Sequence, residues 1–147
     1  MNARENDLLR IQEIYDIATQ TIAQLDELHI CREQFVRPAS AQEALIGEGL
    51  ANRVFRAAEE GGRLSRVFGE YGFELREMSG LRNRLAHAYG TVDMHVVWDV
   101  LQHDFPKLVA ACEAYCEERG IALARTWGAP QAVSETSGPD ERSTPRQ

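Results

Sequence analysis

The chain has few cysteines, few prolines and no long uninterrupted apolar segment. Its three cysteines are an odd number, so Cys31, Cys112 and Cys116 cannot all pair within one chain. Cys112 and Cys116 share a helical face, but no neighbouring ligands complete a metal site, and we expect small buried thiols there. No window approaches the run of about 20 apolar residues that a membrane span needs. These absences disfavour a disulfide scaffold, a metal centre and a membrane protein.

An excess of positive charge is also absent, because the formal net charge is -7 at pH 7. Broad, nonspecific adhesion to nucleic acid needs a basic surface that displaces counterions, and an acidic chain of this kind does not offer one. A small basic cleft stays compatible with this charge. Residues 1–7 lack the basic-then-apolar layout of a secretory signal, so we expect a cytoplasmic protein without membrane contact.

The first half of the chain shows helical periodicity. A composition that is 44% hydrophobic over 147 residues suits one globular domain. Asn2 and Glu5 can cap a long first helix at its start. Its apolar positions recur at alternating spacings of three and four; they are Leu8, Ile11, Tyr15, Ala18, Ile22 and Leu25. The period breaks at residues 28–38, where we expect a turn or short helix anchored by Phe35.

A second helix is predicted to begin at Ser40, because Ser40 and Glu43 can form a reciprocal capping box. It continues to the paired glycines Gly61-Gly62, which are expected to end it. Gly47 and Gly49 lie inside this helix and lower its intrinsic stability. We interpret both as places where another helix approaches closely, and a ligand contact is the less favoured alternative.

The second half predicts two more helices. Residues 63–73 form a connection with about one helical turn, and a third helix covers about 74–89. A fourth helix follows, capped by Thr91 or Asp93, with Pro106 kinking or splitting it. The prediction is an all-α, up-and-down bundle of about four main helices over residues 1–127, followed by a disordered tail over 128–147. We expect three histidines at surface or interhelical positions: His29, His95 and His103. We expect Trp98 and Phe105 in the core.

The stretch that carries most chemistry is Arg82-Asn83-Arg84-Leu85-Ala86-His87-Ala88-Tyr89. On the third helix, Leu85 and its apolar neighbours face the bundle, while Asn83 and His87 stack on the opposite side. A histidine exchanges protons near neutral pH, and an arginine stabilises a phosphate that gains negative charge. With an orienting amide, these groups suffice to cleave RNA without metal. From spacing alone an ordinary solvated helix face is the favoured interpretation, because charged helix faces are common, and spacing does not decide between the two.

This stretch resembles the signature of the HEPN superfamily, in which an arginine and a polar residue precede a histidine. It is most similar to the HepT-like toxins, which have a tyrosine two places beyond that histidine. The segments 45–48, 97–99 and 104–108 also resemble the second and closing helices of that family. The resemblance extends from Leu8 to about Tyr115.

The resemblance implies a homodimer with one composite site, in which the motifs of two chains face each other. Arg82 and His87 would be the catalytic pair of an endoribonuclease, with Asn83 orienting them or the substrate. Arg84 and Arg76 would bind RNA at the rim of the cleft. No metal or cofactor is expected in the protein itself.

The resemblance also implies regulation as the toxin of a type VII-like toxin-antitoxin pair. Tyr89 matches the tyrosine that an MntA-type nucleotidyltransferase antitoxin modifies with AMP. Placing bulk and negative charge at Tyr89 would block the RNA backbone. Two alternatives stay open. Tyr89 can simply pack at a helix end, and the chain can be a non-catalytic HEPN module that dimerises and binds a nucleotidyltransferase or a nucleotide.

Overall fold

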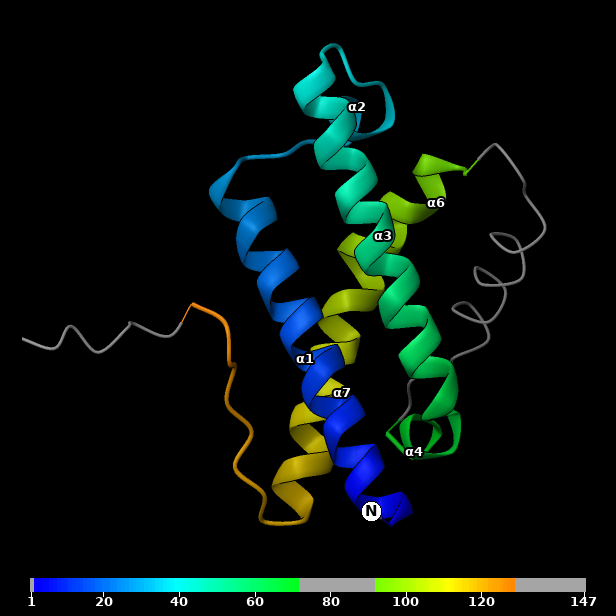
Figure 1. Ribbon diagram of the computed structural model, residues 1–147, viewed down its shortest axis with the longest axis vertical. Coiled ribbons are helices and arrows are strands. Elements are labelled where there is room, and N and C mark those ends of the chain that lie inside the picture. The colour runs from blue at the N-terminus through cyan, green and yellow to red at the C-terminus, as the bar shows by residue number, and fades with distance from the viewer. Residues whose placement is uncertain (1, 72–91, 129–147) are drawn as a thin grey trace, which may run out of the picture.

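The computed structural model describes residues 2–71 and 92–128, and within these ranges every regular element is helical (Figure 1). The all-α prediction is therefore confirmed for the described residues. Six α-helices and one π-helical segment, η1, are present there. In chain order they are α1 (Ala3–Glu27), α2 (Arg32–Val36), α3 (Ala41–Arg63), α4 (Ser65–Gly69), α6 (Met94–Asp99), η1 (Val100–Asp104) and α7 (Phe105–Glu118).

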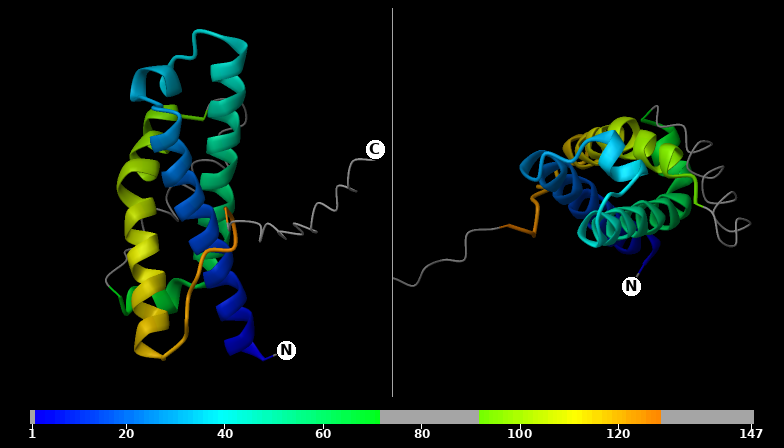
Figure 2. Two further views of the ribbon diagram at one scale, coloured as in Figure 1. Left: turned by 90° about the vertical axis from the view of Figure 1, so that its left-hand side faces the viewer. Right: turned by 90° about the horizontal axis from the view of Figure 1, so that it is seen from above.

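Three columns of helix run side by side along the molecule, formed by α1, by α3, and by α6, η1 and α7 in succession (Figure 2). α1 runs in the opposite direction to the other two columns (Figure 1). It packs against both α3 and α7, whereas α3 and α7 make little contact with each other. At one end of the bundle α2 packs against both α3 and α6. α1 is thus the central element of the described core.

The predicted apolar stripe of α1 forms part of this core. Ile11, Ala18 and Leu25 are buried, as predicted, whereas Leu8, Tyr15 and Ile22 are only half-buried. Three further residues of α1 are buried although the stripe did not include them: Ile14, Ile17 and Thr21.

α1 contributes Ile11 and Ile14, and α7 contributes Phe105 and Leu108, all with no exposed surface. Phe35 is buried at 2% exposure, which confirms it as the anchor of the short helix α2, and its ring lies 5.3 Å from that of Trp98. Packing these side chains away from water is the main driving force for assembling the bundle.

Both predicted N-terminal caps are present, one with a changed partner. The Asn2 side chain accepts from the Glu5 amide over 2.9 Å, and Glu5 bonds back to the Asn2 amide over 3.0 Å. Ser40 Oγ accepts from the Glu43 amide over 3.1 Å, as predicted. The Glu43 carboxylate, however, accepts from the amide of Ala39 over 2.6 Å instead of that of Ser40. Each arrangement uses an amide hydrogen that the helix leaves free.

The glycines of α3 correct two predictions. Gly61 and Gly62 do not end the helix, which continues to Arg63, because tertiary packing around the buried Gly61 outweighs the low helix propensity of glycine. At Gly47 another helix does approach, since a Cβ there would lie 3.6 Å from Met94 Cε. At Gly49 the described helices do not bear out the predicted close approach, because none of the described residues lies within 4 Å of the corresponding position.

The last helical column continues past Pro106, and a widened turn precedes that residue. η1 spans Val100–Asp104, and the Phe105 amide bonds to the carbonyl of Val100, five residues earlier. Proline lacks an amide hydrogen and crowds the preceding turn, so a π-helical turn is a way to carry the helix past it. At the start of this column the Asp93 carboxylate accepts from the His95 amide over 3.0 Å, which identifies Asp93 as the cap.

Two helices end in the same hydrogen-bonded turn, with different residues in the left-handed position. At the end of α1, Ile30 bonds back to the Leu25 carbonyl over 3.2 Å, and His29 takes a φ of 51°. At the end of α7, Ile121 bonds back to the Cys116 carbonyl over 2.8 Å, and Gly120 takes a φ of 64°. Both are Schellman motifs, and only the second has the glycine that this conformation favours.

Beyond α7 the chain forms a strap, residues 121–127, that returns along α1 (Figure 1). Thr126 donates to the Asp16 carboxylate through its amide over 2.9 Å and through its hydroxyl over 2.7 Å. Trp127 Nε1 donates to Thr19 Oγ1 over 2.8 Å. Gln12 Nε2 donates to the Ala124 carbonyl over 2.9 Å. The strap is held by polar contacts that skip more than a hundred residues of sequence.

The remaining parts of the predicted bundle lie outside the described residues. These are the third helix, over 74–89, and nearly all of the predicted tail, since only Gly128 of 128–147 is described. Three helical columns of the predicted four-helix bundle are therefore described. The predicted boundary between the domain and the tail, at residues 127 and 128, stays a prediction.

Candidate functional site

Every residue of the predicted catalytic site lies in the part of the chain that the structure does not describe. This holds for the proposed catalytic pair, for the supporting residues and for the modification site: Arg82, His87, Asn83, Arg84, Arg76 and Tyr89. What the structure does provide is the framework on each side of that segment.

On the N-terminal side the chain is attached to the end of α7 through Tyr71. Its hydroxyl donates to the Glu118 carboxylate. The Tyr71 hydroxyl oxygen in turn accepts a hydrogen bond from Arg119 Nη1 over 2.6 Å. The Arg119 guanidinium also lies 3.7 Å from the centroid of the Tyr115 ring. The bond to Glu118 raises the pKa of Tyr71, because that bond favours the neutral phenol, while the bond from Arg119 opposes it.

On the C-terminal side the chain enters α6 beside α2. Asp93 caps α6, and Arg32 of α2 pairs with Asp99 over 3.3 Å. A second nitrogen of Arg32 lies 3.3 Å from His95 Nδ1. Polar contacts therefore connect the start of α6 to the short helix that precedes α3.

These two attachments lie at opposite ends of the bundle. Tyr71 follows α4, next to the end of α7, whereas Asp93 precedes α6, next to α2 (Figure 1). The two attachments are separated by about the length of α3, which has 23 residues and is about 34 Å long at 1.5 Å per residue.

Outside the motif, the other reactive side chains of the described residues do not assemble a catalytic centre. His29, His95 and His103 are exposed, as expected. No group of three or more potential metal ligands occurs among the residues that were placed. Cys112 and Cys116 are buried, as predicted, whereas Cys31 is exposed. Burial raises the pKa of Cys112 to about 12, so this thiol stays protonated at neutral pH.

The hydrogen bond between Tyr71 and Arg119 was not predicted from the sequence. Tyr71 and Arg119 are 48 positions apart, and neither belongs to a recognisable motif. Local periodicity carries no signal for such a pair, because the contact exists only once α4 and α7 end at the same side of the bundle.

The described residues thus define a small helical-bundle protein whose arginine and histidine motif falls between α4 and α6. A comparison with family models matches residues 8–115 to the family described as Ribonuclease HepT-like. The match covers most of the sequence, and the chain belongs to the HepT-like ribonuclease family. This confirms the resemblance found from the sequence. Comparisons with curated proteins and with solved structures found no match.

None of the described helices is long and apolar enough to cross a membrane. This agrees with the lack of a long apolar run in the sequence.

Proposed function

We propose that the protein is a metal-independent endoribonuclease toxin whose catalytic pair is Arg82 and His87. The observation that carries the proposal is the arginine, asparagine, histidine and tyrosine motif, which lies inside the region matched by the HepT-like ribonuclease family. The attachment of both flanks to the bundle supports it, because a catalytic segment needs a rigid scaffold.

The chemistry follows from the three side chains. The ribose 2′-hydroxyl attacks the adjacent phosphorus, and the bond from phosphorus to the 5′-oxygen breaks. His87 takes up the 2′ proton or supplies a proton to the leaving 5′-oxygen, and Arg82 stabilises the charge that accumulates on the phosphoryl oxygens. Asn83 orients these groups or the RNA. The products are a 2′,3′-cyclic phosphate and a 5′-hydroxyl.

A homodimer would concentrate these groups in one cleft. Each chain contributes one motif, so a twofold contact places two copies of Arg82 near a single phosphodiester. Arg84 and Arg76 add positive charge at the rim of this cleft. Such a local basic site would bind RNA despite the overall net charge of -7.

Regulation would act on the same cleft. We propose that an MntA-like nucleotidyltransferase antitoxin adds AMP to Tyr89, two residues beyond His87. The added phosphate repels the RNA backbone, and the nucleoside occupies its space. This assigns the protein to a type VII-like toxin-antitoxin pair in the cytoplasm.

The decisive experiment measures RNA cleavage by the purified full-length chain in the presence of a metal chelator. We expect 2′,3′-cyclic phosphate ends, and a loss of at least about a hundredfold in rate for His87→Ala, the usual scale of general acid–base catalysis. Arg82→Ala should lower the rate similarly. His103→Ala removes an exposed imidazole of η1 and serves as the matched control, with unchanged activity.

The same measurement addresses the non-catalytic alternative. If folded, dimeric His87→Ala cleaves RNA as fast as the unaltered chain, the catalytic assignment is wrong. A protein that binds the nucleotidyltransferase but cleaves no RNA at any concentration would favour an interaction module.

A further inference from the structure

Arg53 of α3 is a half-buried guanidinium whose hydrogen-bond partners within the described part of the chain are neutral. Its Nη1 donates to Thr21 Oγ1 over 3.3 Å and to the Gln24 side-chain oxygen on α1. Among the described residues, no carboxylate pairs with it. An arginine has five N–H donors, so those on Nη2 and Nε are left for another acceptor.

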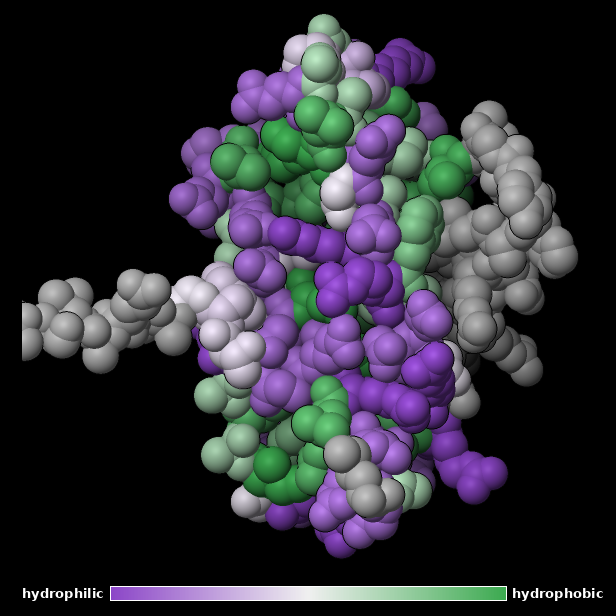
Figure 3. All heavy atoms as spheres, viewed as in Figure 1, coloured by the Kyte–Doolittle hydropathy of each residue, from purple (hydrophilic) through white to green (hydrophobic). Residues whose placement is uncertain are grey.

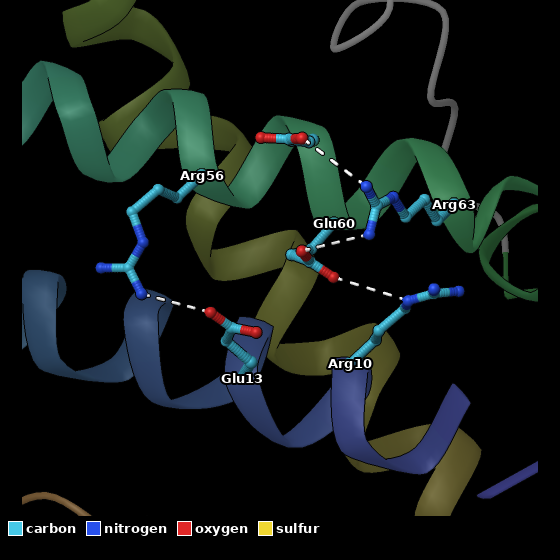
Figure 4. A network of polar contacts seen from close by, with 6 residues as sticks. Arg10, Glu13, Arg56, Glu60 and Arg63 are labelled. Carbon is cyan, nitrogen blue, oxygen red and sulfur yellow. Dashed lines mark hydrogen bonds and ion pairs between the residues drawn. The ribbon is translucent and has the colours of Figure 1, made fainter. Parts of the chain in front are cut away.

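Two other arginines between α1 and α3 each form an ion pair with a carboxylate (Figure 4). Arg56 pairs with Glu13 over 3.2 Å, and Arg10 pairs with Glu60 over 3.6 Å. Burial, and next the positive charge of Arg56, lower the pKa of Arg53. A partly desolvated cation that is repelled by a second cation is normally compensated by an anion.

Arg53 lines a hollow of about 330 Å³ between the C-terminal half of α1 and the N-terminal half of α3. Most of its wall is apolar, and the polar members besides Arg53 are Gln24 and the exposed Glu27. The apolar wall consists of Leu25, Leu28, Ile30, Ile46 and Leu50. In Figure 3 apolar surface gathers over the upper part of this face, above a polar band. The volume falls in the range of small-molecule pockets.

The hollow continues into a second one of about 280 Å³ beside α2. The two share Leu28, Ile30 and Ile46. An elongated apolar group that enters at Arg53 can therefore follow these shared apolar residues into the second hollow. Four other residues of the second hollow are polar: Gln34, Ser40, Gln42 and Glu43.

Gly49 gives the hollow its open side. It lines the hollow, and no atom of residues 2–71 and 92–128 lies within 4 Å of the point where a Cβ would stand. Helix packing therefore does not require a glycine here, although glycine in a helix interior costs stability relative to alanine. A requirement for access to the hollow explains this residue, whereas close approach of another helix does not.

We propose that this hollow binds a small organic anion with an aliphatic body. Its carboxylate or phosphate would accept hydrogen bonds from the remaining donors of Arg53, and its aliphatic part would cover Leu28 and Ile46. A single guanidinium, with Glu27 nearby, favours a compact anion over a polyanion. The lining residues lie outside the motif in the sequence, and this proposal does not rest on the nuclease assignment.

The test is titration of the full-length chain, by calorimetry and by NMR, with octanoate and with octyl phosphate as the two anionic probes. Acetate and inorganic phosphate carry the charge without the chain, and octanol carries the chain without the charge. We expect saturable binding of at least one octyl anion, and at least about tenfold weaker binding of the other three compounds. The stronger of the two octyl probes identifies the preferred anionic group.

Two substitutions locate the binding. Arg53→Met should weaken binding of the octyl anion at least about tenfold, the scale of one hydrogen bond to a charged group. Gly49→Leu should abolish binding by filling the hollow, whereas Gly49→Ala should retain it. Arg63→Met, on the same helix but outside the lining of the hollow, is the matched control and should change the affinity by less than about twofold.

Several outcomes would overturn the proposal. They are octanol binding as tightly as the octyl anions, unchanged binding by folded Gly49→Leu, and no saturable binding of either octyl anion at millimolar concentration. The Gly49 variants keep the test valid if Arg53→Met proves unstable, because they remove no contact of the folded chain.

Discussion

Arg119 at the end of α7 donates from Nη1 to the hydroxyl oxygen of Tyr71 over 2.6 Å. The same hydroxyl donates to Glu118, the last residue of α7, and Arg119 is the C-cap of that helix. Both therefore hold Tyr71, the last described residue before the motif. The scaffold on the N-terminal side of the proposed catalytic helix is therefore attached to the opposite end of the sequence.

Tyr71→Phe should lower the free energy of unfolding, because it removes both hydrogen bonds. The pKa of Tyr71 is raised in the folded chain, chiefly by the bond to Glu118. Its contribution is therefore fully present below the ordinary tyrosine pKa, near 10, and is lost as the pH rises through the higher folded value. Urea unfolding of both proteins at pH 8 and above pH 10 should show the difference shrinking.

Tyr15, whose pKa is raised first by burial, is retained in both proteins and contributes equally to the alkaline background. A difference between the two proteins that stays constant, or grows, with rising pH would contradict this account of the Tyr71 bonds.

Glycine is favoured at the left-handed position of both Schellman turns, so introducing it at position 29 and removing it at position 120 should change stability in opposite directions. His29→Gly should stabilise the protein by about 1 kcal/mol, because a side chain in the left-handed region costs roughly that much. Gly120→Ala should destabilise it by a similar amount. Thermal or urea unfolding measures both. Equal stability of His29→Gly and the unaltered chain would show that the His29 conformation carries no strain.

The strap should detach when Asp16 is changed. Asp16→Ala removes the acceptor for both Thr126 bonds, and hydrogen bonds to a charged group typically contribute at least about 1.5 kcal/mol. We expect trypsin to cleave after Arg125 about tenfold faster in native conditions, as followed by mass spectrometry. Asp26→Ala, on the same helix but without strap contacts, should leave this rate unchanged.

The three cysteine thiols should differ in how fast they react with a thiol reagent at pH 8. Cys112, with a pKa raised to about 12 by burial, and Cys116, whose pKa burial also raises, should react with a thiol reagent only after unfolding. The exposed Cys31 should react in the native state. Cys31→Ser should then abolish the native signal. A fast reaction that persists in Cys31→Ser would mean that α7 opens readily.

The regulatory proposal predicts a covalent change at a single tyrosine. Co-expression with a partner nucleotidyltransferase should yield a chain whose intact mass has increased by AMP. Tyr89→Phe should prevent this increase and leave RNA cleavage uninhibited. Tyr71→Phe is the matched control and should still be modified. An unmodified chain in an inactive complex would instead indicate inhibition by occlusion.

Much of the described fold follows from short-range patterns. The stripe from Leu8 to Leu25 predicted α1 and half of its buried positions, and Phe35 was correctly predicted as an anchor of the core. Caps were predictable because Asn2 and Ser40 act on amides only three residues away. The family was recognisable for a similar reason, since the motif of the proposed site is contiguous in sequence.

Other features depended on contacts that no local pattern contains. Gly47 and Gly49 look alike in sequence, but only Gly47 faces α2 and α6. The π-helical turn before Pro106 is one of several ways to continue past a proline. For the proposed site, the motif indicated the chemistry, while the structure supplied the two anchored flanks at Tyr71 and Asp93.

The sequence alone determined where helices begin, which faces they bury and to which family the chain belongs. These properties depend on residues within about two helical turns of one another, or on a contiguous motif. The tertiary structure alone decided that Tyr71 meets Arg119, that the strap meets Asp16 and that Arg53 lines an apolar hollow. Such contacts arise only after α1, α3 and α7 pack, because packing brings side chains together regardless of their separation along the chain.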